Sequence, residues 1–292
     1  MAFNIKTFQT RALTAIVFVV VMMTGLLWNE WSYFLLFTLI HFGCWVEFQK
    51  LVEKFNPDYK NIDPFHRYGV MIAGWMMLCF FTNNELRIGN VFLTDMAWWL
   101  GGVLVILIPL IQFIRAKSLS LINIGYSITG LIYISLSLAL MVNLRNRWIE
   151  EDASLNMTIP LLIIFTLWVN DTMAYIVGSL IGKTPLSPVS PKKTWEGPVG
   201  GMILAIVVMC LVAYFTGRLS LVHTAIIAAI TCVAGTFGDL FESKLKRMAG
   251  VKDSGAIMPG HGGFLDRFDS LLFAATASWL YVALFLPSSL IM

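Results

Sequence analysis

Near its C-terminus the chain reads KDSGAIMPGHGGFLDRFDS, Lys252 to Ser270, a charged and glycine-rich stretch in an otherwise apolar sequence. Asp266 and Asp269 lie three residues apart at the expected start of the last helix, so they share a helical face. Gly262 and Gly263 allow backbone N–H groups to approach an anionic ligand closely. Carboxylates that hold a metal ion and cations that hold phosphate are the two requirements of phosphoryl or nucleotidyl transfer. The simpler alternative for Asp266 is a capping role at the helix dipole.

Polar residues at helical spacing precede this stretch and favour the same chemistry. The polar face is formed by Asp239, Glu242, Ser243 and Lys246. These residues recur at the spacing of neighbours on one side of a helix, which Gly250 is expected to end. Arg247 and Arg267 add positive charge beside the two groups of acids, so we expect phosphate contacts here.

A second segment, LWVNDTMAYIVGSLIGK (167–183), places Asp171 near the middle of an apolar run. An acid at that depth costs several kcal/mol, about 3 on insertion scales, unless it faces protein, water or a cation. Tyr175, Gly178 and Gly182 fall on the same helical face, and such small residues let a helix or a ligand approach closely. The alternative for Asp171 is a hydrogen bond to a neighbouring helix.

A third segment, GKTPLSPVSPKKTWEGPVG (182–200), contains prolines that forbid a continuous helix and predict an extended, stiff loop. It presents paired ammonium groups among hydroxyls, namely Ser190, Lys192, Lys193 and Thr194. This combination suits phosphate oxygens because it offers charge and short hydrogen bonds together. The alternative is that these lysines are only the positive charge that is usual in cytoplasmic loops of membrane proteins.

The acids predict a hard, oxygen-ligated cation such as Mg²⁺ rather than zinc, because the four cysteines all lie in apolar runs without metal-ligand spacing. The expected metal ligands are Asp239 and Asp266, followed by Asp171 and Asp269. Lys192, Lys193, Lys246 and Arg267 are expected to contact phosphates. His261 either bonds a phosphate oxygen or structures its loop. Walker A, GxSxG and HExxH sequences are absent, which argues against P-loop, serine hydrolase and zincin chemistry.

The amino-acid composition indicates which kind of fold holds the charged and polar residues named above. Hydrophobic residues make up 58% of the chain and charged residues 13%, with a mean hydropathy of +0.78. The sequence therefore predicts an all-α, polytopic integral membrane protein of about nine spans, with the N-terminal apolar run retained as the first helix. The expected spans are 12–28, 31–48, 68–82, 91–114, 119–142, 158–181, 198–216, 221–238 and 268–290. A net charge of +3 does not favour a nucleic-acid partner.

Charge between the spans predicts an orientation. If the N-terminus is cytoplasmic, 16 of the 20 Lys and Arg residues lie on the cytoplasmic face. We therefore expect the C-terminus on the opposite side and both motif-rich loops, 182–198 and 239–267, in the cytoplasm. Residues 1–150, with about five spans and few polar residues inside them, are expected to be scaffold. Residues 151–292, with about four spans, are expected to be the catalytic region.

The polar blocks also resemble those of a known family. S-K-L-K-R-x4-K-D-x5-P-G-H-G-G-x2-D-R-x-D (Ser243 to Asp269) is similar to the signature of the bacterial phosphatidate cytidylyltransferases, or CDP-diacylglycerol synthases. D-T-x-A-Y-x2-G (Asp171 to Gly178) and S-P-K-K-T-W-E-G (Ser190 to Gly197) resemble the other blocks of that family. The N-terminal half resembles it in hydropathy alone.

The resemblance implies that CTP and phosphatidic acid react to give CDP-diacylglycerol and pyrophosphate in phospholipid biosynthesis. It implies Mg²⁺, with K⁺ as an optional second cation, and a multi-pass position in the bacterial cytoplasmic membrane with the active site on the cytoplasmic side. CTP, phosphatidic acid and membrane lipids are the expected partners, and a homodimer is left open. The expected substrate contacts are Tyr175, Ser190, Lys192, Lys193, Thr194, Ser243, Arg247, Lys252, Gly262 and Gly263.

Two alternatives remain open, a related lipid enzyme and a membrane transporter. A CDP-archaeol synthase or a CTP-dependent polyprenol kinase would keep the fold and the site but change the lipid. A CDP-alcohol phosphotransferase would carry D-G-x2-A-R…G-x3-D-x3-D, which is absent. A transporter would be expected to carry acids on several mid-membrane helices, whereas Asp171 is the one carboxylate near the centre of an expected span.

Overall fold

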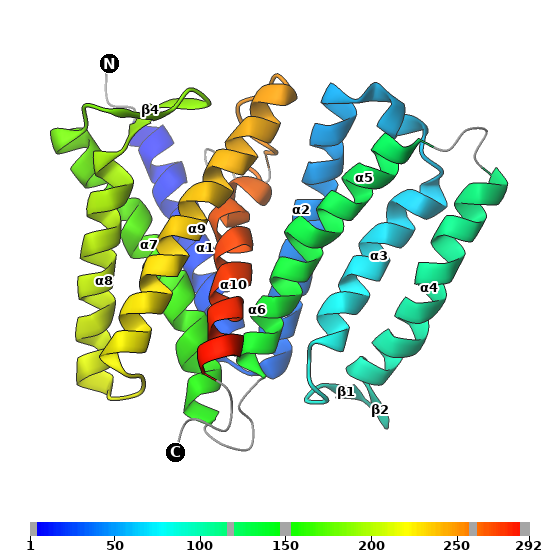
Figure 1. Ribbon diagram of the computed structural model, residues 1–292, viewed down its shortest axis with the longest axis horizontal. Helices are drawn as coiled ribbons and strands as arrows, with labels where there is room; N and C mark the ends of the chain where they lie inside the picture. The colour runs from blue at the N-terminus through cyan, green and yellow to red at the C-terminus, as the bar shows by residue number, and fades with distance from the viewer. Residues whose placement is uncertain (1–4, 116–119, 147–152, 257–261, 287–292) are drawn as a thin grey trace. The chain divides into compact units, whose positions relative to one another are not determined.

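The computed structural model describes residues 5–115, 120–146, 153–256 and 262–286, and these residues are mostly helical (Figure 1). The α-helices are α1 (Ile5–Leu27), α2 (Glu30–Phe55), α3 (Pro64–Phe80), α4 (Leu93–Arg115), α5 (Leu121–Gly130), α6 (Ser137–Arg145), α7 (Ala153–Ile181), α8 (Glu196–Thr216), α9 (Leu221–Met248) and α10 (Leu265–Phe285). A π-helical stretch, η2 (Leu131–Leu136), joins α5 to α6, and a 3-10 helix, η1 (Pro57–Asn61), follows α2. Two antiparallel hairpins pair β1 (Arg87–Ile88) with β2 (Val91–Phe92) and β3 (Pro185–Ser187) with β4 (Ser190–Thr194).

The described helices confirm an all-α polytopic membrane protein. Seven of them are long and apolar enough to cross a membrane: α2, α4, the joined α5–η2–α6, α7, α8, α9 and α10. Residues 13–27 of α1 form a shorter apolar helix, and α3 has 17 residues. Each of the nine expected apolar segments is therefore mostly helical in the described part of the chain.

Local sequence signals fix several helix ends. Asn29 caps α2 by accepting the backbone N–H of Ser32 at 2.8 Å, while the Ser32 hydroxyl accepts the Asn29 N–H at 3.0 Å. This reciprocal cap produces the tight turn at WNEW. Gly217 ends α8 in the left-handed region, at a φ of 64°, where its N–H bonds the Ala213 carbonyl.

The chain forms two compact units, and each combines segments from both halves of the sequence. The first unit comprises the described residues of Met1–Val142 and Leu245–Phe268, and the second those of Asn143–Lys244 and Asp269–Met292. Helices α9 and α10 each contribute residues to both units. Residues 245–268 group by their contacts with the N-terminal helices. The division of scaffold from catalytic region near residue 150 stays a prediction.

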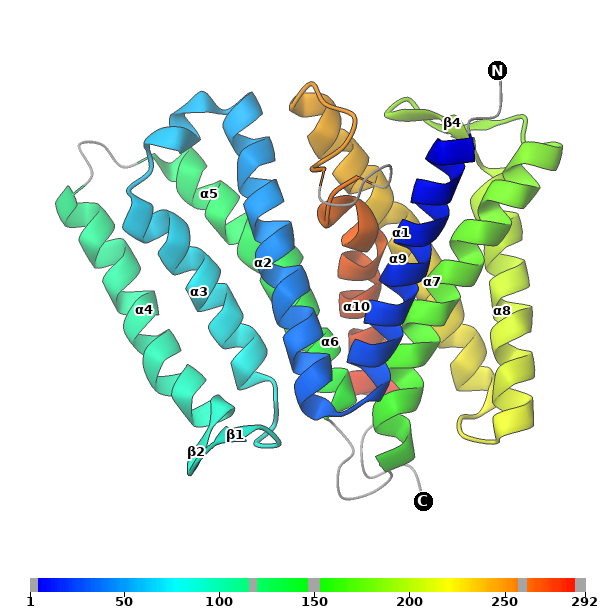
Figure 2. The same ribbon diagram turned by 180° about the vertical axis from the view of Figure 1, so that it is seen from behind.

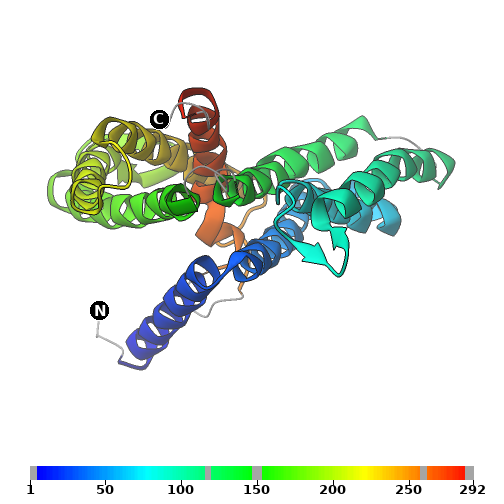
Figure 3. The ribbon, with the colours of Figure 1, turned by 90° about the horizontal axis from the view of Figure 1, so that it is seen from below.

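The first unit is held by polar contacts between buried side chains as well as by apolar packing. Ser135 of η2 accepts the indole N–H of Trp45 at 2.8 Å and lies 3.0 Å from Nε2 of His41, both on α2. All three side chains are buried. Helix α3 packs against η2 and α4 (Figure 2), and the β1–β2 hairpin joins α3 to α4 (Figure 3).

In the second unit, α7 and α8 lie side by side along their lengths (Figure 1). Glycines at the start of α8 permit this approach. A Cβ atom on Gly201 would lie 2.8 Å from the Asn170 carbonyl oxygen and 2.9 Å from the Ala174 backbone nitrogen. Small residues at such a crossing let two membrane helices come into backbone contact.

We expect Gly201→Ala to destabilise the protein by about 1–3 kcal/mol, because the new methyl group would overlap backbone atoms that cannot move aside. Thermal unfolding in detergent, followed by circular dichroism, measures the effect. Gly102→Ala in α4 is the matched control, since a Cβ atom there meets nothing within 4 Å. Equal melting temperatures for the two variants would contradict the proposed packing.

Candidate active site

A polar pocket of about 400 Å³ lies in the second unit, between the β3–β4 hairpin and helices α7, α8, α9 and α10. It is lined by Asn170, Asp171, Ala174, Tyr175, Gly178, Ser179, Lys192, Lys193, Thr194, Gly197, Pro198, Thr236, Asp239 and Ser270. Three sequence segments that were singled out for their chemistry therefore meet in one cavity. We call this cavity the polar pocket.

Opposite charges face each other inside the polar pocket. The Lys193 ammonium on β4 pairs with the Asp239 carboxylate on α9. The Ser243 hydroxyl, one turn further along α9, donates to the other Asp239 oxygen at 3.4 Å. Asp171 and Lys192 line the same cavity. Two carboxylates and two ammonium groups thus line one cavity, a combination that suits a ligand with both phosphate and a bound cation.

Two neutral polar atoms of the polar pocket have spare hydrogen-bonding capacity. The side-chain oxygens of Asn170 and Thr194 are buried and, within the described residues, make no hydrogen bond. Only 4% of the Asn170 surface is exposed. Buried polar groups are normally hydrogen-bonded, so unfilled ones that line a cavity fit a ligand that supplies the missing partner.

The loop predicted to be extended is a hairpin anchored at both ends. Ser187 pairs with Ser190 across a two-residue turn, and the Trp195 N–H donates to the Thr184 carbonyl at 2.9 Å. The Glu196 carboxylate accepts the Thr184 N–H at 3.1 Å. These contacts hold β4, and with it Lys192 and Lys193, against the pocket.

The close approach predicted along the small-residue face of α7 is confirmed. A Cβ atom on Gly182 would overlap the Thr194 side chain, and one on Gly178 would lie 3.4 Å from its hydroxyl. Gly197 of α8 reaches the same face of α7. Glycines at these positions therefore allow β4 and α8 to close around the polar pocket.

A separate group of hydrogen bonds surrounds Asp266 in the first unit. One carboxylate oxygen of Asp266 accepts the N–H groups of Ser254 and Gly263, both at 2.8 Å, and lies 2.9 Å from the Ser254 hydroxyl. The other oxygen pairs with the Lys246 ammonium at 2.7 Å. The side chains of Asp266 and Lys246 are only 9% and 15% exposed. We call Lys246, Ser254, Gly263 and Asp266 the Asp266 cluster.

The acids that were predicted to bind metal have different local environments. Asp171 and Asp239 share the polar pocket, whereas Asp266 belongs to the other unit and is surrounded by hydrogen-bond donors. Asp269 is buried in α10 and accepts the Ser270 N–H at 2.7 Å. No group of three or more His, Cys, Asp or Glu in the described part of the chain is placed to hold a metal ion. The four predicted ligands thus do not form one such group.

The remaining predicted residues occupy varied positions. Tyr175 lines the polar pocket and is 79% exposed, whereas Ser190 begins β4 outside the pocket lining. Gly262 has a φ of 82°, and a side chain there would crowd the Asp266 carboxylate. Exposed positions are occupied by Arg247, Lys252 and Arg267. His261 lies outside the described residues.

Two buried polar residues of the first unit were not predicted from the sequence. Glu47, on a helix expected to be scaffold, is 2% exposed and bonds residues around Asp266. Ser254 lies between the two carboxylates, 2.7 Å from Glu47 and 2.9 Å from Asp266. One sequence feature could have indicated Glu47: it is an acid at the end of an apolar run, and it lies on the same helical face as Gly43, four residues earlier.

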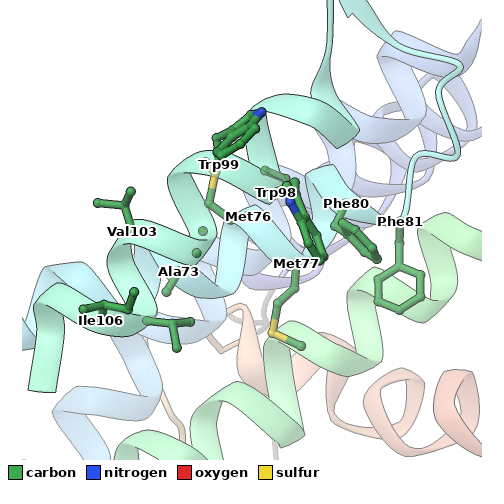
Figure 4. A pocket seen from close by; sticks show the side chains of 13 residues that line it. Ala73, Met76, Met77, Phe80, Phe81, Trp98, Trp99, Val103 and Ile106 are labelled. Carbon is green, nitrogen blue, oxygen red and sulfur yellow. The ribbon is translucent and has the colours of Figure 1, made fainter.

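A larger cavity of about 650 Å³ between α3 and α4 is almost purely apolar (Figure 4). Trp98, Trp99, Met76, Met77 and Phe80 are among its lining residues, and none of the lining residues is charged. It therefore offers no charged side chain for binding phosphate or Mg²⁺. The polar pocket is therefore the candidate for the chemistry.

The apolar helices define a polytopic membrane protein. Its polar pocket, lined by acids and lysines, suits a charged, phosphate-bearing ligand. Residues 9–285 match the model of the cytidylyltransferase family, and the chain belongs to that family. This confirms the resemblance found in its polar blocks.

Named relatives support the same grouping. The chain is 38% identical over 189 residues to a phosphatidate cytidylyltransferase of Staphylococcus saprophyticus, a match covering 59% of this chain and 73% of that protein. It is 35% identical over 217 residues to one of Synechocystis, covering 67% and 73% respectively. Chloroplastic phosphatidate cytidylyltransferase 4 of Arabidopsis thaliana is 42% identical over 113 residues, or 38% of this chain. The matched part spans only 29% of that plant protein.

Proposed function

We propose that the protein transfers the cytidylyl group of CTP to phosphatidic acid, giving CDP-diacylglycerol and pyrophosphate. Membership of the cytidylyltransferase family and the names of its relatives support this reaction. The observation that carries the proposal is the polar pocket, where Asp171 and Asp239 lie with Lys192 and Lys193. That set matches the needs of a nucleoside triphosphate better than those of an uncharged lipid.

The reaction needs binding and alignment more than proton transfer. A phosphate monoester has a second pKa of about 6, so the lipid phosphate is mostly dianionic near neutral pH. One of its oxygens attacks the α-phosphorus of CTP and forms a new P–O bond. The bond from the α-phosphorus to the oxygen bridging the β-phosphorus breaks, and pyrophosphate leaves with that electron pair. The protein must therefore hold two anions together in line and stabilise the departing charge.

The described residues offer a specific division of tasks. Lys192 and Lys193 would bind phosphate oxygens of CTP by charge-assisted hydrogen bonds. The buried oxygens of Asn170 and Thr194 would accept hydrogen bonds from the nucleotide or its bound water. The Asp266 cluster would fix Gly262, Gly263 and the first turn of α10, which carries Arg267.

Asp171 and Asp239 fit a magnesium ion, because Mg²⁺ in nucleotide sites needs only one or two protein carboxylates beside phosphates and water. The Lys193 ammonium against Asp239 shows that a positive charge is accommodated at that carboxylate. When bound, the ion would neutralise the charge of the triphosphate. The Lys193 ammonium would then bind a phosphate oxygen, and the Asp239 carboxylate would bind the cation.

We place the reaction at the cytoplasmic face of a bacterial cytoplasmic membrane. The support is the sequence distribution of Lys and Arg, which favours a cytoplasmic N-terminus. Lys192 and Lys193 then lie on the side where CTP is found. The same charge bias puts Lys246 and Arg267 on that side.

The test uses purified protein in detergent with phosphatidic acid, Mg²⁺ and CTP labelled at the α- or the γ-phosphate. We expect the α label in the lipid product and the γ label in pyrophosphate, with at least about a 10²-fold loss of rate when the metal is chelated. Inside-out vesicles should react with added CTP, and right-side-out vesicles should not. A γ label in an added polyprenol would instead establish a kinase, and no product with any lipid would overturn the proposal in favour of a transporter.

A further inference from the structure

Glu47 is a buried carboxylate without a charged partner near the end of α2. It is 2% exposed and forms no ion pair within the described residues. A buried carboxylate is costly unless its oxygens accept hydrogen bonds. Its partners should therefore identify what this residue does.

Within the described residues, the hydrogen bonds of Glu47 go to Ser254 and to the start of α10. One of its oxygens accepts the Phe264 N–H at 3.0 Å. The other accepts the Leu265 N–H at 2.8 Å and lies 2.7 Å from the Ser254 hydroxyl. The N–H groups of Phe264 and Leu265 are at the start of α10, where a helix has no internal acceptors. Glu47 thus caps α10 from another helix.

Neighbouring glycines show that this contact is closely fitted. A Cβ atom on Gly255 or on Gly263 would overlap the Glu47 carboxylate. One turn before Glu47, a Cβ atom on Gly43 would overlap the ring of Phe264. One face of helix α2 therefore contacts the Phe264 ring at Gly43 and accepts the Phe264 N–H at Glu47.

The contact continues from Glu47 to Asp266 through one hydroxyl group. Ser254 lies 2.7 Å from Glu47 and 2.9 Å from Asp266, and its own N–H donates to Asp266 at 2.8 Å. Asp266 in turn pairs with Lys246. A shift of Ser254 or of the first turn of α10 would therefore displace the carboxylate that holds the Lys246 ammonium.

We infer that Glu47 is a positioning residue, which fixes Ser254 and the start of α10 so that Asp266 holds Lys246 in place for the reaction. This inference rests on the proposed function only for its kinetic consequence. The geometric part concerns the order of the loop and can be tested whatever the reaction proves to be. Misplacing a group by about 1 Å can cost a factor of 10² in rate, so a distant anchor can have a large effect.

The test compares Glu47→Gln with Glu53→Gln in the full-length protein. Glu53 is also on α2 but pairs with Arg67 at 2.6 Å, away from the loop. In Glu47→Gln an amide group replaces one acceptor oxygen, so at least one N–H or hydroxyl partner loses its acceptor. We expect amide exchange at Phe264 and Leu265 to rise by at least about tenfold. Exchange in Glu53→Gln should match that of the wild type.

Kinetics then separate positioning from simple stability. At a temperature where all variants are fully folded, we expect kcat of Glu47→Gln to fall at least about tenfold and that of Glu53→Gln to stay within about twofold. Ser254→Ala should lower kcat similarly, and it carries the test if Glu47→Gln fails to fold. Because both residues act on Asp266, the double variant should be no more than about twofold slower than the slower single variant.

The outcomes are distinct. Faster exchange with unchanged kcat, or multiplicative losses in the double variant, would overturn the positioning role. Unchanged exchange at Phe264 and Leu265 would overturn the anchoring contact itself. If the wild type transfers no cytidylyl group, the proposed function fails, while the exchange experiment still decides whether Glu47 holds the loop.

Discussion

Asp239→Asn is expected to lower the rate of cytidylyl transfer by at least about 10²-fold, the usual size when a charged group at a phosphate-transfer site is neutralised. The carboxylate on α9 faces Lys193 in the polar pocket and is bonded by Ser243. Asparagine keeps the shape of the side chain but removes the charge that would hold a magnesium ion. We therefore also expect the Mg²⁺ concentration for half-maximal rate to rise by at least about tenfold.

The measurement is the labelled-CTP assay over a range of Mg²⁺ concentrations. Asp95→Asn is the matched control, because Asp95 is an exposed acid in the first turn of α4 and does not line the polar pocket. It should leave the rate and the Mg²⁺ dependence unchanged. If Asp239→Asn keeps the wild-type Mg²⁺ dependence, this carboxylate does not bind the metal ion, even if the rate falls.

Sequence patterns sufficed for the helices and for the family of this protein. Long apolar runs predict membrane helices because the bilayer leaves the backbone few alternatives. Paired Lys192 and Lys193 and the acids Asp171 and Asp239 predict phosphate and metal binding from residue type alone. Their meeting in one pocket depends on how α7, α8 and α9 pack, which local spacing does not encode.

The acids also show why environment cannot be read from residue type. Asp239 and Asp266 look alike in the sequence, and both were expected to bind metal first. In the structure, Asp239 faces the polar pocket, whereas Asp266 accepts backbone N–H groups of Ser254 and Gly263. The donors come from loop geometry set by Glu47, a residue separated from Ser254 by 207 positions in the chain. No periodicity connects positions so far apart.

Asp266→Asn is expected to destabilise the protein as well as to inactivate it. The amide offers one acceptor oxygen in place of two, although three groups besides Lys246 bond this side chain. It also leaves the largely buried Lys246 ammonium without its counter-charge, and breaking a buried ion pair costs about 3–5 kcal/mol. We expect a lower melting temperature together with a rate loss of at least about 10²-fold.

The dependence on Mg²⁺ distinguishes this role from that of a metal ligand. If Asp266 organises its loop, the Mg²⁺ concentration for half-maximal residual rate should stay within about threefold of the wild-type value, whereas a metal ligand would raise it as in Asp239→Asn. Asp253→Asn, an exposed acid of the same loop, should behave as the wild type. Adding Lys246→Met to Asp266→Asn should recover part of the stability, because the unpaired buried charge is removed, but not the activity. If stability and activity both recover in the double variant, the Lys246–Asp266 ion pair is structural and takes no part in the reaction. If Asp266→Asn shifts the Mg²⁺ dependence strongly, Asp266 is a metal ligand.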